Sequence, residues 1–109
     1  MKVRITNIDT CVVYFSNGAK LSSYHDADCC EYNYADFEQL EEAALDTEFD
    51  WPLTFEETQN YGFRFGNRPN KMFFVPCYSF QNGYYSSDVD IELNGEVVLN
   101  VGCTIEYDY

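Results

Sequence analysis

Apolar and polar residues alternate over residues 2–8 of the chain and again over residues 11–16. Alternation with a period of two predicts β-strands, because successive side chains of a strand point to opposite faces of a sheet. Asn17 and Gly18 follow directly, and this dipeptide favours the positive φ angles of a type I′ turn. Residues 19–24 then supply the return strand. The sequence therefore predicts an opening β-hairpin with its turn at Asn17 and Gly18.

The C-terminal half contains further strand-like segments separated by turn residues. Asn94 and Gly95 form a second dipeptide that is typical of tight hairpins. Pro76 lies inside one strand-like segment, and proline has no backbone N–H with which to pair. That strand is therefore predicted to lie at an edge of the sheet, or to be bulged at Pro76. The predicted strands cover residues 61–65, 72–80, 88–93, 96–101 and 104–109, and a turn is predicted over 66–70.

A short helix is predicted between the two strand-rich parts. Asp36, with Gln39 three residues later, is typical of a helix start, because the carboxylate can accept hydrogen bonds from the free N–H groups of the first turn. The segments 25–33 and 46–58 on either side are predicted to be irregular. Four apolar residues at helical spacing predict one buried face: Phe37, Leu40, Ala44 and Leu45. Three acidic residues point away from that face: Glu38, Glu41 and Glu42.

These elements together predict an α+β fold. We expect residues 1–109 to form a single domain with one modest core. Its expected architecture is a single twisted antiparallel sheet of about six to eight strands, with hairpins at 17–18 and 94–95 and one short acidic helix packed on one face. The opening residues MKVRITNI contain no apolar segment, and no run in the chain is long enough to span a membrane, so we expect a cytoplasmic protein.

Charge is the feature of the composition that changes this picture. Nineteen acidic residues face six basic ones, and no Lys or Arg occurs between Lys20 and Arg64. This field repels nucleic-acid phosphates and argues against direct DNA or RNA binding. It would speed encounter with a basic protein surface, although it could also serve solubility alone. The candidate partner-binding residues are Asp36, Glu38, Glu41, Glu42, Asp46 and Glu48.

Potential metal ligands gather in the segment HDADCCE at residues 25–31. The single histidine precedes two adjacent cysteines by four and five residues, and imidazole with thiolates is a ligand set that suits zinc. Two cysteines from predicted strands could close a tetrahedral site, which would be structural. The alternative is a surface histidine beside two half-buried thiols. The candidate zinc ligands are His25, Cys29, Cys30, Cys77 and Cys103.

A thiol enzyme is the third interpretation of these residues. Cys29 or Cys30 could be a nucleophile with His25 as its base, but no third group that would orient the histidine is evident. The acidic residues around both cysteines disfavour a thiolate. The fifth cysteine, Cys11, alternates with Val12 and is predicted to lie in the core. The sequence therefore favours a binding protein over an enzyme.

Two blocks of the sequence resemble small phage and prophage proteins. Residues 25–42 (HDADCCEYNYADFEQLEE) are similar to an H-x-x-D-C-C-E segment followed by an acidic helix. Residues 82–93 (NGYYSSDVDIEL) are similar to a later N-G-Y-Y-S-x-x-V-D segment. Cys77 and Cys103 belong to neither block. The resemblance implies a phage origin and a shared fold, while most members of that group have no assigned activity.

Small, acidic, single-domain phage proteins are also the usual form of anti-CRISPR proteins. By this analogy, the expected function is inhibition of a type II Cas effector nuclease in the bacterial host cell. The acidic protein would bind the effector's basic nucleic-acid channel and block loading of target DNA. A restriction enzyme or a polymerase with a basic groove fits the charge equally well. The alternative is a phage accessory zinc-binding protein without a nuclease target.

Overall fold

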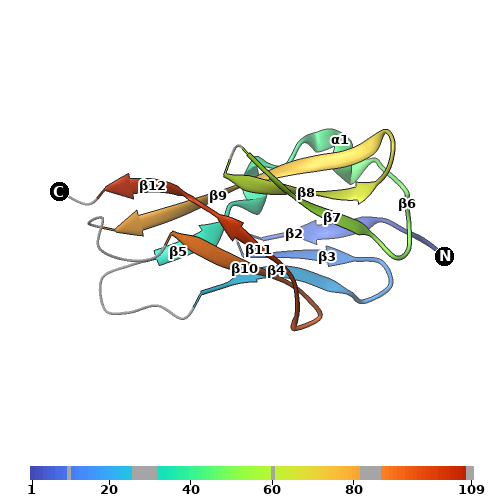
Figure 1. Cartoon of the computed structure of the whole chain (residues 1–109). Coiled ribbons are helices and arrows are strands. Elements are labelled where there is room, and N and C mark those ends of the chain that lie inside the picture. The colour runs from blue at the N-terminus through green and yellow to red at the C-terminus, as the bar shows by residue number, and fades with distance from the viewer. Residues whose placement is uncertain (10, 26–31, 60, 82–86, 108–109) are drawn as a thin grey trace.

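The computed structural model describes residues 1–9, 11–25, 32–59, 61–81 and 87–107, and strands dominate this part of the chain (Figure 1). The helical elements within it are a 3₁₀ turn, η1 (Phe37–Gln39), and a one-turn helix, α1 (Glu42–Leu45). The strands are β1 (Lys2–Val3), β2 (Ile5–Ile8), β3 (Val12–Phe15), β4 (Lys20–Tyr24), β5 (Tyr32–Ala35), β6 (Phe49–Asp50), β7 (Thr54–Thr58), β8 (Gly62–Asn67), β9 (Lys71–Gln81), β10 (Asp88–Leu93), β11 (Glu96–Gly102) and β12 (Thr104–Tyr107).

The strands form three sheets, and the two larger sheets make two layers (Figure 1). The first layer has the order β11-β10-β4-β3-β2. The second has the order β12-β9-β8-β7, with β5 also paired to β9. β1 and β6 form a small two-stranded sheet. The predicted α+β fold with a single antiparallel sheet is therefore wrong: the protein is mostly β, and β12 even runs parallel to β9.

The physical reason lies in how the layers are covered. A sheet must bury its apolar face against another element, and a one-turn helix is too small to cover so many alternating strands. Two sheets can cover each other instead. The chain passes between them at several points, from β4 to β5, from β9 to β10, and at Cys103, where β11 pairs with β10 in the first layer and β12 pairs with β9 in the second. Alternation along a strand reveals that one face is buried, but not what buries it.

Both predicted hairpins are present, with one difference in turn type. Asn94 and Gly95 have φ angles of +54° and +85°, as a two-residue type I′ turn requires. The first hairpin joins β3 to β4 through a longer turn: the Phe15 N–H donates to the Ala19 carbonyl (3.0 Å), and the Gly18 N–H donates to the Phe15 carbonyl (3.0 Å). Of the predicted dipeptide there, only Gly18 has a positive φ (+87°). This is the geometry of a type I turn followed by a G1 bulge.

The single helix predicted over residues 36–45 is replaced by two short turns. Asp36 starts η1 as predicted, since its carboxylate accepts hydrogen bonds from the Glu38 N–H (3.2 Å) and from the Gln39 side-chain amide (2.8 Å). The backbone then becomes extended at Leu40, with ψ of 135°, before α1 begins. In place of the acidic helix that was expected to cover the sheet, η1 and α1 form a short rim beside the two layers.

Two segments that were predicted to be irregular contain strands. The end of the predicted irregular segment 25–33 belongs to β5, which pairs antiparallel with β9. The segment 46–58 contains β6 and β7, and Phe49 and Leu53 within it are buried. Pro52 and the surrounding acidic residues dominate this sequence and conceal its alternation.

β9 changes its neighbours at Pro76. Among the described residues, the part of β9 from 71 to 76 pairs with β8 alone, so it is an edge on its other side. Beyond Pro76, residues 77–80 pair with β5 and residues 78–81 pair with β12. The Pro76 carbonyl still accepts a hydrogen bond from the Asp36 N–H (2.9 Å). The prediction that this strand lies at an edge or is bulged at Pro76 therefore holds only for the first part of β9, because the second part is paired on both sides.

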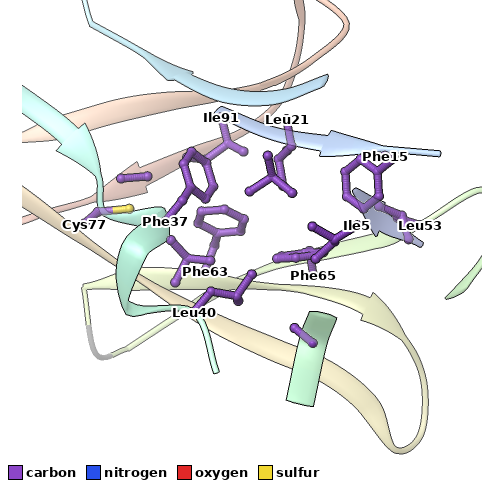
Figure 2. Packing of buried hydrophobic residues seen from close by; sticks show 14 of the residues in the cluster. Ile5, Phe15, Leu21, Phe37, Leu40, Leu53, Phe63, Phe65, Cys77 and Ile91 are labelled. Carbon is purple, nitrogen blue, oxygen red and sulfur yellow. The ribbon is translucent and has the colours of Figure 1, made fainter. Parts of the chain in front are cut away.

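The buried hydrophobic residues meet between the two layers (Figure 2). Phe63 and Phe65 of β8 are fully buried in this core. The Phe63 ring meets Phe37 of η1 edge-on, with centroids 6.4 Å apart, and the Phe65 ring meets Phe15 of β3 in the same way at 6.2 Å. Aromatic residues from η1, β3 and β8 therefore join the rim and both layers into one cluster, whose burial is the main stabilising contribution.

Candidate functional site

His25 lies just after β4, half-buried, and lines a cavity of about 230 Å³. Cys29 and Cys30 lie outside the described residues. Cys11 lines the same cavity and is exposed, so the prediction that it belongs to the core is wrong. Cys11 lies outside β3 in a turn, where its N–H donates to the Asp9 carboxylate (2.8 Å). The strand alternation that suggested a buried position for Cys11 begins only at the next residue.

Cys77 and Cys103 come together in the core. Both are buried, and the hydrogen bond from one thiol to the other, together with burial, raises the pKa of the Cys77 thiol far above its ordinary value. This environment favours neutral thiols in the metal-free protein. The two cysteines serve as small apolar residues where the chain crosses between the layers. Within the described ranges, no three His, Cys, Asp or Glu side chains form a group that could hold a metal ion.

Zinc stays a prediction that rests on His25 with Cys29 or Cys30. We expect one zinc per chain in protein purified without added metal, and we expect chelation to lower the melting temperature. His25→Ala should lower the zinc content and remove the effect of the chelator. Cys103→Ala, which alters a buried thiol, should leave the zinc content unchanged. Elemental analysis and thermal melts check this; well under one equivalent of zinc, with identical melts, would contradict it.

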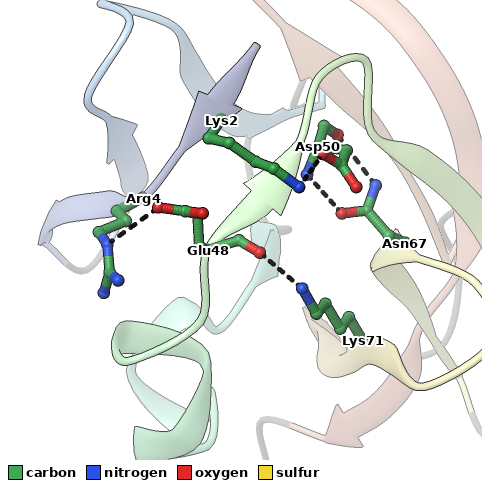
Figure 3. Close-up of polar contacts among 6 residues, drawn as sticks. All are labelled: Lys2, Arg4, Glu48, Asp50, Asn67 and Lys71. Carbon is green, nitrogen blue, oxygen red and sulfur yellow. Dashed lines mark hydrogen bonds and ion pairs between the residues drawn. The ribbon is translucent and has the colours of Figure 1, made fainter.

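The predicted partner-binding residues divide into two groups. Glu38, Glu41 and Glu42 are exposed at η1 and α1. Glu48 instead approaches Arg4 (3.9 Å) in the polar contacts between β1 and β6 (Figure 3). The Asp36 carboxylate caps η1. Asp46 is exposed, and only its backbone carbonyl accepts a hydrogen bond, from Arg4 Nη1 (3.5 Å).

All six basic side chains of the sequence are described, and each has a contact within the chain. Lys2 pairs with Asp50, and the hydrogen bond between them raises the pKa of Lys2 and lowers that of Asp50. The Lys71 ammonium donates to the Glu48 carbonyl (3.1 Å; Figure 3). The other four are Arg4, which approaches Glu48; Arg64 and Arg68, which both pair with Glu56; and Lys20, which lies over the Tyr14 ring.

A cluster of aromatic side chains lies on the outer side of β5 and β9, and we call it the tyrosine face: Tyr32, Tyr34, Tyr78 and Phe80. Tyr32 pairs with Phe80 and Tyr34 with Tyr78 across the two strands, so all four lie on one side of the sheet. The Tyr32 and Tyr34 rings stack with centroids 4.9 Å apart, and Tyr34 lies 5.8 Å from Tyr78. Tyr32 is 55% exposed and Phe80 is 43% exposed.

Carboxylates lie beside the tyrosine face. Burial raises the pKa of the Tyr34 hydroxyl, and the negative charges of Glu106 and Asp36 raise it further. The Gln39 amide donates both to the Tyr78 hydroxyl (3.0 Å) and to the Asp36 carboxylate (2.8 Å), and so connects the face to η1. The sequence contains a signal for this face, namely tyrosines two residues apart at 32 and 34. Because residues 25–33 are predicted to be irregular, the sequence does not show that these two tyrosines lie on one strand.

Comparisons with known proteins add no family. No protein-family model matches the chain, and searches of the curated proteins and of the solved structures find no match. Among the described residues, no helix is long and apolar enough to cross a membrane.

Proposed function

We propose that this chain is a phage-derived inhibitor of the anti-CRISPR type, which binds a basic, nucleic-acid-handling surface of a type II Cas effector nuclease. The observation that carries the proposal is the distribution of charge. The net charge is −13, and every Lys and Arg side chain already has a contact within the chain. The surface therefore offers carboxylates to a partner and little positive charge that could attract phosphates.

Binding alone is sufficient for such an inhibitor. The effector holds its guide and target in a positively charged channel and reads a short DNA motif with arginine side chains. An acidic domain that occupies this channel or covers the arginines excludes target DNA without any chemical step. The same charge speeds the encounter, and salt should slow it.

An order-of-addition assay with a purified effector tests this function. We expect inhibition of DNA cleavage to reach completion at about one equivalent of inhibitor and to disappear when target DNA is bound first, because both ligands need the same basic surface. Replacing Glu38, Glu41 and Glu42 by Gln should weaken inhibition by roughly tenfold while the melting temperature changes little, because exposed charges add little stability.

The matched control carries the same change in net charge on strands β7, β10 and β11, away from η1 and α1. Replacing Glu57, Glu92 and Glu96 by Gln should weaken inhibition much less. Equal losses in both triple variants would show that only total charge matters and that η1 and α1 are not the contact. Complete inhibition at a small fraction of one equivalent would show turnover and contradict the proposal.

A further inference from the structure

Two large side chains of the tyrosine face are exposed although they add nothing to the buried core. Tyr32 and Phe80 expose about half of their surface, and they lie directly opposite each other on β5 and β9. The core is complete without them, since the inward residues of the same strands are already buried. Large, rigid aromatic side chains of this kind are enriched at the centres of protein interfaces.

The charges around the tyrosine face select the kind of partner. Glu106 of β12 pairs alongside Phe80, and Asp36 is connected to Tyr78 through Gln39. A nucleic acid could stack its bases on such rings, but a binding groove for single strands also needs basic residues along the backbone. Among the described residues, Glu106 and Asp36 are the carboxylates whose charges act on Tyr34. Aromatic rings with adjacent carboxylates attract cations, through the ring quadrupole and through direct pairing.

A small cavity lies beside the tyrosine face. Tyr32 and Tyr34 belong to both features, and Tyr24 and His25 of the neighbouring chain segment line the cavity as well. Its volume of about 230 Å³ is below the roughly 300–1,000 Å³ of sites for drug-sized ligands. A guanidinium group suits these surroundings better than an ammonium group, because it is planar, stacks on aromatic rings and is less strongly hydrated.

We propose that the tyrosine face, with Glu106 and Asp36, binds arginine side chains of a basic protein partner. The proposal deepens the proposed function and rests on it for the identity of the partner. The arginines would belong to a protein surface that otherwise contacts nucleic acid. The contact would be centred on β5, β9 and β12, and η1 would form its acidic rim.

Short synthetic peptides provide a test that contains no effector. Calorimetry of the full chain should show that a peptide of alternating Arg and Gly binds more tightly than the Lys version, and that a citrulline version, which has the same shape without charge, does not bind. Tyr32→Leu and Glu106→Gln should each weaken binding of the Arg peptide by about five- to tenfold. The matched controls Tyr14→Leu and Glu96→Gln, which alter a half-buried tyrosine on β3 and an exposed carboxylate on β11, should change it by less than about twofold.

Several outcomes would overturn the inference. Equal affinity for the Arg and citrulline peptides, or for the Arg and Lys peptides, would contradict it. So would an equal loss of Arg-peptide affinity in Glu106→Gln and Glu96→Gln. Tighter binding of a single-stranded oligonucleotide than of the Arg peptide would also contradict it. Chemical-shift mapping of the Arg peptide on the unaltered protein keeps the test valid if a variant does not fold. Inhibition of the effector without peptide binding contradicts this inference alone, and peptide binding without inhibition contradicts the proposed function alone.

Discussion

Replacing Gly66 by alanine should lower the free energy of unfolding by about 3 kcal/mol or more. Gly66 lies in β8 between β7 and β9, with a φ of +137°, which L-residues with a side chain rarely adopt. A Cβ atom at this position would lie 1.9 Å from the Lys71 carbonyl oxygen and 3.1 Å from the Phe49 ring. The backbone of β9 would have to move, and the pairing of the central strand β8 would suffer.

Gly18→Ala provides the matched control. Gly18 also has a positive φ, of +87°, but no heavy atom lies within 4 Å of the position that a Cβ would take. Only the conformational cost should then remain, at about 1 kcal/mol. Urea unfolding of both variants measures the difference. If both lose the same stability, the backbone around Gly66 relaxes freely, and the close approach of Lys71 does not constrain the fold.

The structural role of Gly66 could not be predicted from the sequence. Residues 66–70 were predicted to be a turn, but Gly66 and Asn67 continue β8, and Asn67 pairs with Lys71. A glycine ends a strand in some proteins and permits a close approach of two strands in others. The sequence alone does not distinguish these cases, because the neighbouring carbonyl comes from another strand.

Local features were predictable, and long-range features were not. The hairpin at Asn94 and Gly95 and the start of η1 at Asp36 depend on residues within a few positions of each other, so the sequence indicates them directly. The division into two layers depends on strand pairing over long separations, for example at Cys103, where the chain leaves the sheet of β11 and β12 pairs with β9 in the other layer. No local pattern encodes that change, since β11 and β12 both look like ordinary strands.

The candidate site follows the same rule. The excess of acidic residues indicates an acidic surface. The approach of Glu48 to Arg4, however, depends on the pairing of β1 with β6, which are far apart in the sequence. The tyrosine face likewise depends on the register of β5 against β9, which brings Tyr34 opposite Tyr78. Predicting either feature from the sequence would require knowledge of strand pairing.

Phe37→Ala should destabilise the protein by about 3–5 kcal/mol, a large share of the roughly 5–15 kcal/mol by which a domain of this size is stable. Phe37 is fully buried, and its ring meets Phe63 edge-on at the centre of the core (Figure 2). Truncation removes this contact and leaves a cavity between the layers that the paired strands cannot close. Urea unfolding, with the slope of the transition unchanged, measures the loss.

Leu45→Ala distinguishes the two short elements η1 and α1 from the continuous helix that the sequence predicts. A continuous helix over 36–45 would place Phe37 and Leu45 on one buried face, and both truncations would then be costly. In the structure the extended backbone at Leu40 interrupts the helix, and Leu45 is 43% exposed. Leu45→Ala should therefore cost less than about 1 kcal/mol. Comparable losses from Phe37→Ala and Leu45→Ala would indicate that the continuous amphipathic helix forms after all, and that η1 and α1 are parts of it.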